Sequence, residues 1–178
     1  MLPDLSDSVT AAQAILGWKI VHNTPLGPVG GTIIETEAYA ADDPASHSFK
    51  GVTLRTQPML KQAGTMYMYF IYGKHWCFNI VTGPEGSGEA VLIRALLPTD
   101  GIDIMQTNRK TKNMHNLCNG PGSLVQALAI PSAYNGQLLS NTDMRLIPSG
   151  SVIKNIQVGK RIGISKATEK LWRFYLKT

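Results

Sequence analysis

Cysteine is scarce in this chain. Only Cys77 and Cys118 occur among the 178 residues, and they form no C-x-x-C pair. Two isolated cysteines cannot build a disulfide framework, which favours a reducing, cytoplasmic environment. His47 has no second histidine or cysteine at ligand spacing, so we expect no bound metal.

The sequence also has no segment that resembles a signal peptide, no apolar run long enough to span a membrane, and no internal repeat. The first residues lack the basic and apolar regions of a signal peptide. Lys74 and His75 interrupt the most apolar stretch, so no membrane association is expected. Neither a G-x-G-x-x-G nor a P-loop pattern occurs, and we expect no cofactor. Without repeats or composition shifts, residues 1–178 are predicted to form one domain.

Acidic residues are outnumbered by basic ones. The chain has 17 lysines and arginines against 12 aspartates and glutamates, a net charge of +5. This excess favours a polyanionic partner such as a nucleic acid. Many soluble proteins are equally basic, so charge alone does not identify the partner.

Two carboxylates stand in an apolar segment, residues 30–39, that is predicted to be a strand. Side chains alternate along a strand, so Glu35, Glu37 and Tyr39 share one face. A charge is costly to bury without a partner, so this pattern is hard to explain as packing. It indicates either a pocket that binds a flat group and does acid–base chemistry, or an edge strand with one solvated face.

Other elements follow from periodicity, caps and turn residues. Helices are expected over residues 7–17, from 101 to 106, and over 124–129. Strands are expected over residues 18–22, 30–39, 89–98, 146–148, 152–158 and 173–176, together with a hairpin over 64–81.

The hairpin over 64–81 is unusual because a large aromatic residue, Tyr72, precedes Gly73 at its tip. An exposed ring beside the cation of Lys74 is suited to enter a minor groove and separate base pairs. The alternative is a hairpin buried in the core, with Tyr72 inside. Asn79, polar in an apolar strand, needs a partner in the protein or in a ligand.

Arg94 lies within the apolar strand over 89–98, where an unpaired charge is costly, and Glu37 is the expected partner. His47 lies in the loop after the Glu37 strand. It is either an ordinary hydrogen-bonding residue or a residue of the functional site. The basic stretch that follows, with Thr53 and Arg55, suits phosphate contacts but equally suits a solvated loop.

The motifs, taken together, resemble one family. They are ETEAY at 35–39, SHS at 46–48, YMYFIYG at 67–73, LIRAL at 92–96, NGPG at 119–122 and RFY at 173–175. In this order they are similar to the alkyladenine (3-methyladenine) DNA glycosylase family, and the compact chain resembles its bacterial members. The resemblance implies a single α+β domain with a curved, mostly antiparallel sheet, flanking helices and a protruding β-hairpin.

The resemblance implies catalytic roles for three residues. Glu37 is expected to act as the general base that activates water. Arg94 and the backbone carbonyl of Ile162 are expected to help hold that water. A cationic alkylated purine leaves without a general acid, so one carboxylate is sufficient, whereas O-glycosidases typically need two.

The resemblance also implies how the DNA is bound. The partner is expected to be double-stranded DNA with alkylated bases, bound by a monomer. The extruded base is expected to stack among Tyr39, His47 and Tyr69, while Tyr72 fills the gap in the duplex. Asn79 and Leu92 are expected to bound the pocket and to exclude guanine. From the residues themselves, rather than from the resemblance, Thr53, Arg55 and Lys74 are expected to contact the DNA.

Two other functions fit the same residues. A non-catalytic nucleic-acid-binding protein would use the same aromatic and basic surface. A hydrolase of free nucleosides would also need a carboxylate and an aromatic pocket. The positive charge and the Tyr72 tip favour a polymeric substrate. No lysine stands out in the pocket motifs as a Schiff-base nucleophile, so lyase activity is not expected.

Overall fold

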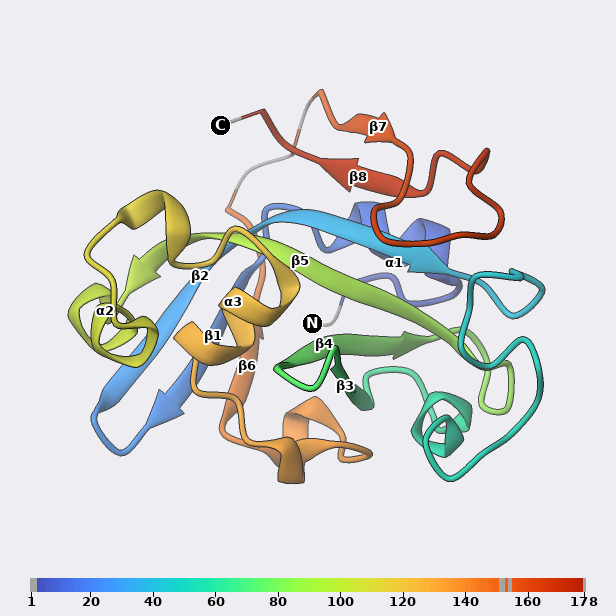
Figure 1. Ribbon diagram of the computed structural model, residues 1–178, viewed down its shortest axis with the longest axis horizontal. Coiled ribbons are helices and arrows are strands. Elements are labelled where there is room, and N and C mark those ends of the chain that lie inside the picture. The colour runs from blue at the N-terminus through green and yellow to red at the C-terminus, as the bar shows by residue number, and fades with distance from the viewer. Residues whose placement is uncertain (1–2, 151–152, 154, 178) are drawn as a thin grey trace.

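An eight-stranded sheet forms the centre of the protein, as seen in a computed structural model that describes residues 3–150, 153 and 155–177 (Figure 1). The main strand order is β3-β4-β5-β2-β1-β6, and β8 pairs with both β2 and β7. All of these pairings are antiparallel. The strands are β1 (Lys19–Thr24), β2 (Gly27–Tyr39), β3 (Met66–Ile71), β4 (His75–Thr82), β5 (Glu89–Asp100), β6 (Met144–Ile147), β7 (Gln157–Gly159) and β8 (Arg173–Tyr175).

β2 is the strand on which the site depends, because it has neighbours along both edges. β5 pairs along one edge, while β1 covers the first half of the other edge and β8 covers the second half. Two glycines permit this close packing. A Cβ atom on Gly30 would lie 2.6 Å from the Ile20 carbonyl oxygen, and one on Gly31 would lie 2.5 Å from that of Leu97.

The helices are short and lie on both faces of the sheet. They are α1 (Ser8–Ala14), α2 (Ile102–Arg109) and α3 (Pro121–Ala127). In Figure 1, α3 lies in front of the sheet and α1 behind it. Asp7 caps α1 by accepting hydrogen bonds from the backbone N–H groups of Val9 and Thr10. Single 3-10 turns occur at Gln57–Leu60, Met114–Asn116, Ser132–Tyr134 and Leu139–Asn141.

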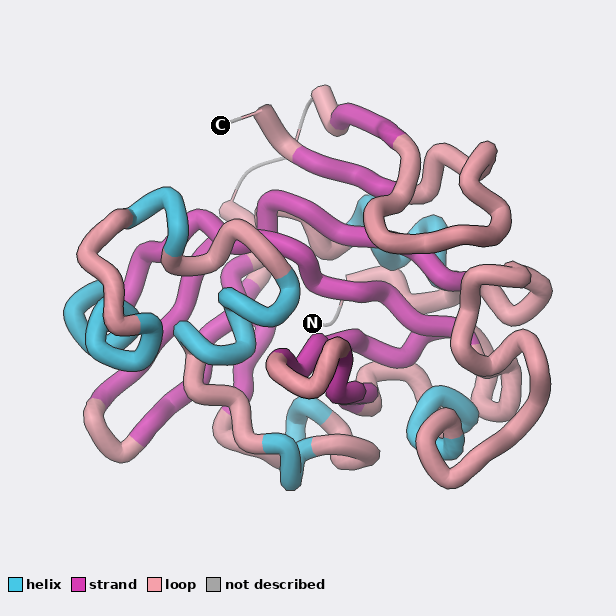
Figure 2. The backbone as a smooth tube through the Cα atoms, in the orientation of Figure 1, coloured by secondary structure: helices cyan, strands magenta, loops and turns pink. Residues whose placement is uncertain are grey.

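Most of the chain outside the sheet is loop (Figure 2). The loop after β2 and the loop between β7 and β8 lie next to each other at one end of the sheet (Figure 1), where Asp43 of the first loop pairs with Arg161 of the second. One continuous apolar core joins the strands to α1, α2 and α3. A smaller cluster of Met59, Tyr67, Val81 and Ala90 packs beneath Tyr69. No helix among the described residues is long and apolar enough to cross a membrane.

The expected α+β domain with an antiparallel sheet is confirmed, and so is the hairpin. Its tip is a three-residue turn, 72–74, closed by the pairing of Ile71 with His75. Several expected boundaries were wrong, among them the end of α1, which lies at Ala14 rather than at residue 17. α3 begins at Pro121 rather than at residue 124, because proline is well suited to the first turn of a helix. Of the strand expected over 152–158, only Gln157 and Val158 are strand, while residues 152 and 154 lie outside the described residues.

Candidate active site

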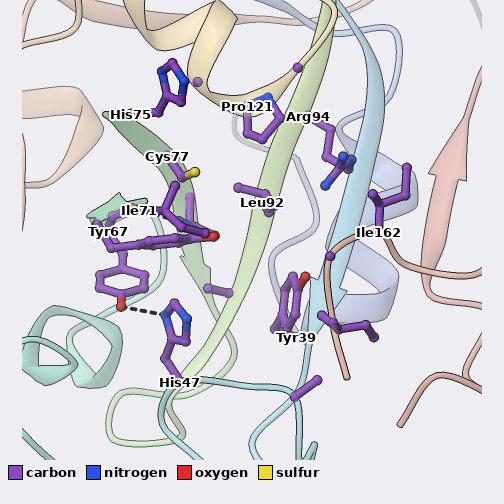
Figure 3. Close-up of a pocket in the computed structure, with 18 of the residues that line it drawn as sticks. Tyr39, His47, Tyr67, Ile71, His75, Cys77, Leu92, Arg94, Pro121 and Ile162 are labelled. Carbon is purple, nitrogen blue, oxygen red and sulfur yellow. Dashed lines mark hydrogen bonds between the residues drawn. The ribbon is translucent and has the colours of Figure 1, made fainter. Parts of the chain in front are cut away.

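A cavity of about 530 Å³ opens beside the start of α3 (Figure 3). Side chains of β2, β3, β4 and β5 line it, together with loop residues from 44–47 and 162–166 and with residues 120–123 at the start of α3. In Figure 3, Tyr39 and Ile162 lie on one side, His47 and Tyr67 on the other, and Leu92 between them. The expected site residues on its wall are Tyr39, His47, Tyr69, Tyr72, Asn79, Leu92, Arg94 and Ile162.

Glu37 lies immediately behind this wall and has an exposed fraction of 0%. Its Oε1 accepts a hydrogen bond of 2.7 Å from the Ile162 backbone N–H, and lies 3.3 Å from Nη1 of Arg94. Its Oε2 accepts a hydrogen bond of 2.8 Å from the hydroxyl of Tyr39. These three partners compensate for the burial of the charge. The Ile162 contact uses the N–H, whereas the resemblance implied a role for the carbonyl.

A row of alternating charges continues from Glu37 along the sheet. Nε of Arg94 donates to Oε1 of Glu35 at 3.2 Å, and Nη1 of Arg173 donates to the same oxygen at 3.0 Å. The expected pairing of Arg94 with Glu37 is therefore present, and Glu35 shares the arginine. Both glutamates contact one side chain, which agrees with their expected position on the same face of β2.

Aromatic rings form the two sides of the cavity. His47 meets the ring of Tyr69 edge-on with centroids 4.6 Å apart, and its Nδ1 shares a hydrogen bond of 2.9 Å with the Tyr67 hydroxyl. Burial raises the pKa of Tyr39 and of Tyr69 above that of free tyrosine, and the Glu37 charge adds to the effect at Tyr39. Burial also raises the pKa of Tyr67 to about 12. All three phenols are therefore neutral at physiological pH, and Tyr39 can donate to Glu37.

His47 is neutral for a related reason. Partial burial of its ring and, to a smaller extent, the nearby Arg55 charge lower its pKa below 6.5. The imidazole thus adds no positive charge to the cavity at pH 7. It lies on the Tyr69 side, opposite Tyr39.

Asn79 and Leu92 face each other across β4 and β5 as paired residues of the sheet. Nδ2 of Asn79 donates a hydrogen bond of 3.0 Å to the backbone carbonyl of Tyr67, which fixes the amide plane. This is the partner that a buried asparagine requires. Both residues line the cavity.

The hairpin tip projects into solvent. Tyr72 is 78% exposed and has a φ of 53°, a left-handed conformation that is uncommon for a residue other than glycine. The alternative in which Tyr72 is buried in the core is therefore wrong. Lys74 is also exposed at this tip, and the ring of Tyr72 lies at the rim of the cavity.

The two other expected DNA contacts lie in the loop after His47. Both Thr53 and Arg55 are exposed. The guanidinium of Arg55 lies 5.4 Å from the centroid of the Tyr69 ring. Arg55 therefore borders the aromatic side of the cavity, whereas the Thr53 hydroxyl is within hydrogen-bond distance of Thr56, at 3.1 Å.

Sequence reasoning missed other residues that line the cavity or lie behind its wall. Tyr67 and Cys77 line the cavity, and their alternation on the hairpin could have identified them. Asp43 and Arg161 pair behind Tyr39 but are 118 positions apart, so no local pattern connects them. No group of three or more potential metal ligands occurs among the side chains that the structure describes.

Comparisons with known proteins identify the family of this chain. A model of the methylpurine-DNA glycosylase family matches residues 4–178, and the chain therefore belongs to that family. It is 45% identical over 175 residues to a protein of Methanoculleus marisnigri, covering 96% of this chain and 91% of the relative. It is 44% identical over 174 residues to a Francisella tularensis protein (96% and 90% covered), and 43% over 171 residues to one from Nitrosospira multiformis (96% and 86%). Each relative bears the name "Putative 3-methyladenine DNA glycosylase".

Proposed function

We propose that this protein is a monofunctional DNA glycosylase that removes alkylated purines, such as 3-methyladenine, from duplex DNA in base excision repair. Membership of the methylpurine-DNA glycosylase family and the names of relatives that match along nearly the whole chain support the reaction class. The observation that carries the mechanism is the Glu37 carboxylate, held by three groups of the cavity wall.

The arrangement around Glu37 suits a general base. A carboxylate offers about four acceptor positions, and the described residues occupy three of them. The remaining position can accept a proton from water. Because the carboxylate has no exposed surface, a small displacement of Tyr39 or Ile162 must admit that water when the base enters.

The reaction is a hydrolysis at C1′ of the damaged nucleotide. The water oxygen forms a bond to C1′ while the C1′–N bond breaks. The electron pair of the C1′–N bond leaves with the purine. The water proton passes to Glu37. An alkylated purine that carries a positive charge departs as a neutral base, so no general acid is required. Arg94 orients the carboxylate and the water.

The aromatic sides of the cavity suit an extruded base. Tyr39 on one side and Tyr69 with His47 on the other provide faces for stacking, and a cationic base gains cation–π attraction. The amide of Asn79, fixed by Tyr67, limits the pocket where the 2-amino group of guanine would project. Tyr72 at the exposed tip fills the gap that the base leaves in the duplex.

The test is incubation with duplex DNA that carries 3-methyladenine, followed by measurement of released base and of abasic sites. A glycosylase releases the free base and leaves an intact abasic strand. Binding without release would favour the nucleic-acid-binding alternative. Preference for alkylated nucleosides over duplex DNA would favour the nucleoside hydrolase. Strand cleavage at the abasic site would contradict the monofunctional assignment.

A further inference from the structure

An ion pair between Asp43 and Arg161 is completely buried behind the cavity wall. Both side chains have an exposed fraction of 0%. Nη1 of Arg161 donates to Oδ2 of Asp43, and Nη2 donates to Oδ1 at 3.1 Å. Such a bidentate pair fixes the plane of the guanidinium as well as its position.

This pair connects three segments that form the cavity. Nη1 of Arg161 also donates to the carbonyl of Ala38 at 2.8 Å, between Glu37 and Tyr39 on β2. Asp43 belongs to the loop that carries His47 to the cavity. Arg161 immediately precedes Ile162, whose N–H is bonded to Glu37.

The guanidinium also supports an aromatic wall. Its central carbon lies 4.7 Å from the centroid of the Tyr39 ring and 5.3 Å from that of Trp172. Arg161 is therefore in contact with Tyr39 through the ring, and it is one residue from the amide that bonds Glu37. Tyr39 and Ile162 contribute two of the three hydrogen-bonding or ionic contacts of Glu37 described above.

Stability alone does not explain this pair. The desolvation of two charges offsets most of their attraction, and apolar replacement of a buried pair is often neutral or stabilising. Nε of Arg161 is buried with no hydrogen-bond partner among the described residues, which adds a further cost. What the pair provides is a fixed geometry among segments that are remote in sequence.

We propose that Asp43 and Arg161 are positioning residues that hold the Ile162 N–H against Glu37 and the Tyr39 ring against the extruded base. This inference rests on the proposed glycosylase function. It assigns a catalytic consequence to two residues that do not line the cavity.

The test compares the variants Arg161→Met and Asp43→Leu with the double variant Arg161→Met/Asp43→Leu. Each single variant leaves one buried charge unpaired and is expected to melt at a lower temperature. The double variant replaces both charges with apolar groups and is expected to regain most of the melting temperature. Its single-turnover excision rate should remain at least about tenfold below that of the unmodified protein, with affinity for damaged duplex changed less than about threefold.

A second readout does not depend on activity. In hydrogen exchange, the Ile162 amide of the double variant is expected to exchange at least about tenfold faster, while amides at the centre of β5 keep their protection. A matched control is Lys19→Met/Asp100→Leu, which removes a partly exposed pair between β1 and β5 whose residues do not line the cavity. This control should change neither the excision rate nor the Ile162 exchange.

The possible results separate the two proposals. A double variant that regains its melting temperature and also excises at the original rate would overturn the positioning role. Unchanged Ile162 exchange in the double variant would overturn it as well, whatever the activity. Failure of the unmodified protein to release alkylated bases would instead overturn the proposed function, and the exchange measurement would still decide whether the pair positions Ile162.

Discussion

The backbone N–H of Ile162 donates a hydrogen bond of 2.7 Å to Oε1 of Glu37, a residue 125 positions away in the sequence. This bond joins β2 to the loop between β7 and β8, and it fixes one oxygen of the proposed base. The other oxygen is held by Tyr39. The proposed chemistry therefore depends on the path of the C-terminal loop as much as on the strand that carries Glu37.

Replacement of Glu37 with glutamine tests the general base directly. Glu37→Gln keeps the size of the side chain but removes its ability to accept a proton, so single-turnover excision should fall by about three orders of magnitude or more. Binding of damaged duplex should persist. Substantial release of base by this variant at pH 7 would place the base elsewhere, with Glu35 the next candidate.

Replacement of Glu35 with glutamine tests the shared arginine. Without the Glu35 charge, Arg94 loses its Nε ion pair, and we expect it to pair more closely with Glu37. The excision rate should fall about tenfold, which corresponds to about 1.4 kcal/mol of transition-state stabilisation. The control is Arg173→Gln, which removes a side-chain ion pair of Glu35 but leaves the Glu35–Arg94 pair in place, and it should have a smaller effect. A loss as large as that of Glu37→Gln would contradict this interpretation.

Local patterns predicted those parts of the site that lie within single elements. Alternation placed Glu35, Glu37 and Tyr39 on one face of β2. This prediction succeeded because the direction of a side chain in a strand depends on its immediate neighbours. The pairing of Arg94 with Glu37 was also predictable, since a charge in an apolar strand requires a partner.

Contacts made through loops were beyond sequence reasoning. The Asp43–Arg161 pair and the Ile162–Glu37 bond each depend on how an irregular segment returns to the sheet. No periodicity in the sequence predicts the path of such a segment. The start of α3 differs from these contacts, because Pro121 at its first turn is a local signal that favours a helix beginning at that residue.

Salt dependence tests the contacts with DNA. If basic residues neutralise phosphates, the affinity for undamaged duplex should fall with ionic strength, with a log–log slope of about −0.9 for each phosphate. Arg55→Gln and Lys74→Gln should each reduce the steepness of this slope by about 0.9, the contribution of one phosphate. Lys19→Gln is the control, because Lys19 is already paired with Asp100 at 2.6 Å. A flat response in the unmodified protein would contradict the polyanion interpretation.

The lowered pKa of His47 predicts a pH dependence of binding. The imidazole is neutral at pH 7 and becomes charged only as the pH falls below 6.5, its ordinary value. A protonated His47 would then repel a cationic base in the cavity. In a Glu37→Gln background, which prevents excision, affinity for duplex containing 3-methyladenine should therefore weaken between pH 7 and pH 5.

The additional variant His47→Asn should abolish the His47 contribution to that weakening. The matched ligand control is duplex DNA that contains ethenoadenine, a neutral lesion. The affinity for this duplex should depend less on pH. An equal pH dependence with and without His47 would assign the effect to another group.

The last prediction concerns Tyr72, whose ring is expected to act only in the complex with DNA. Because the side chain is 78% exposed, Tyr72→Ala should leave the melting temperature nearly unchanged, whereas loss of a buried ring costs about 3–5 kcal/mol. Tyr72→Gly should be at least as stable as Tyr72→Ala, because glycine adopts the φ of 53° without strain. Both variants should excise more slowly and give a weaker 2-aminopurine signal for base extrusion, while Tyr72→Phe, which keeps the ring, should retain most of both. Normal extrusion by Tyr72→Ala would show that the exposed ring is not the wedge, and would leave its left-handed conformation without a functional reason.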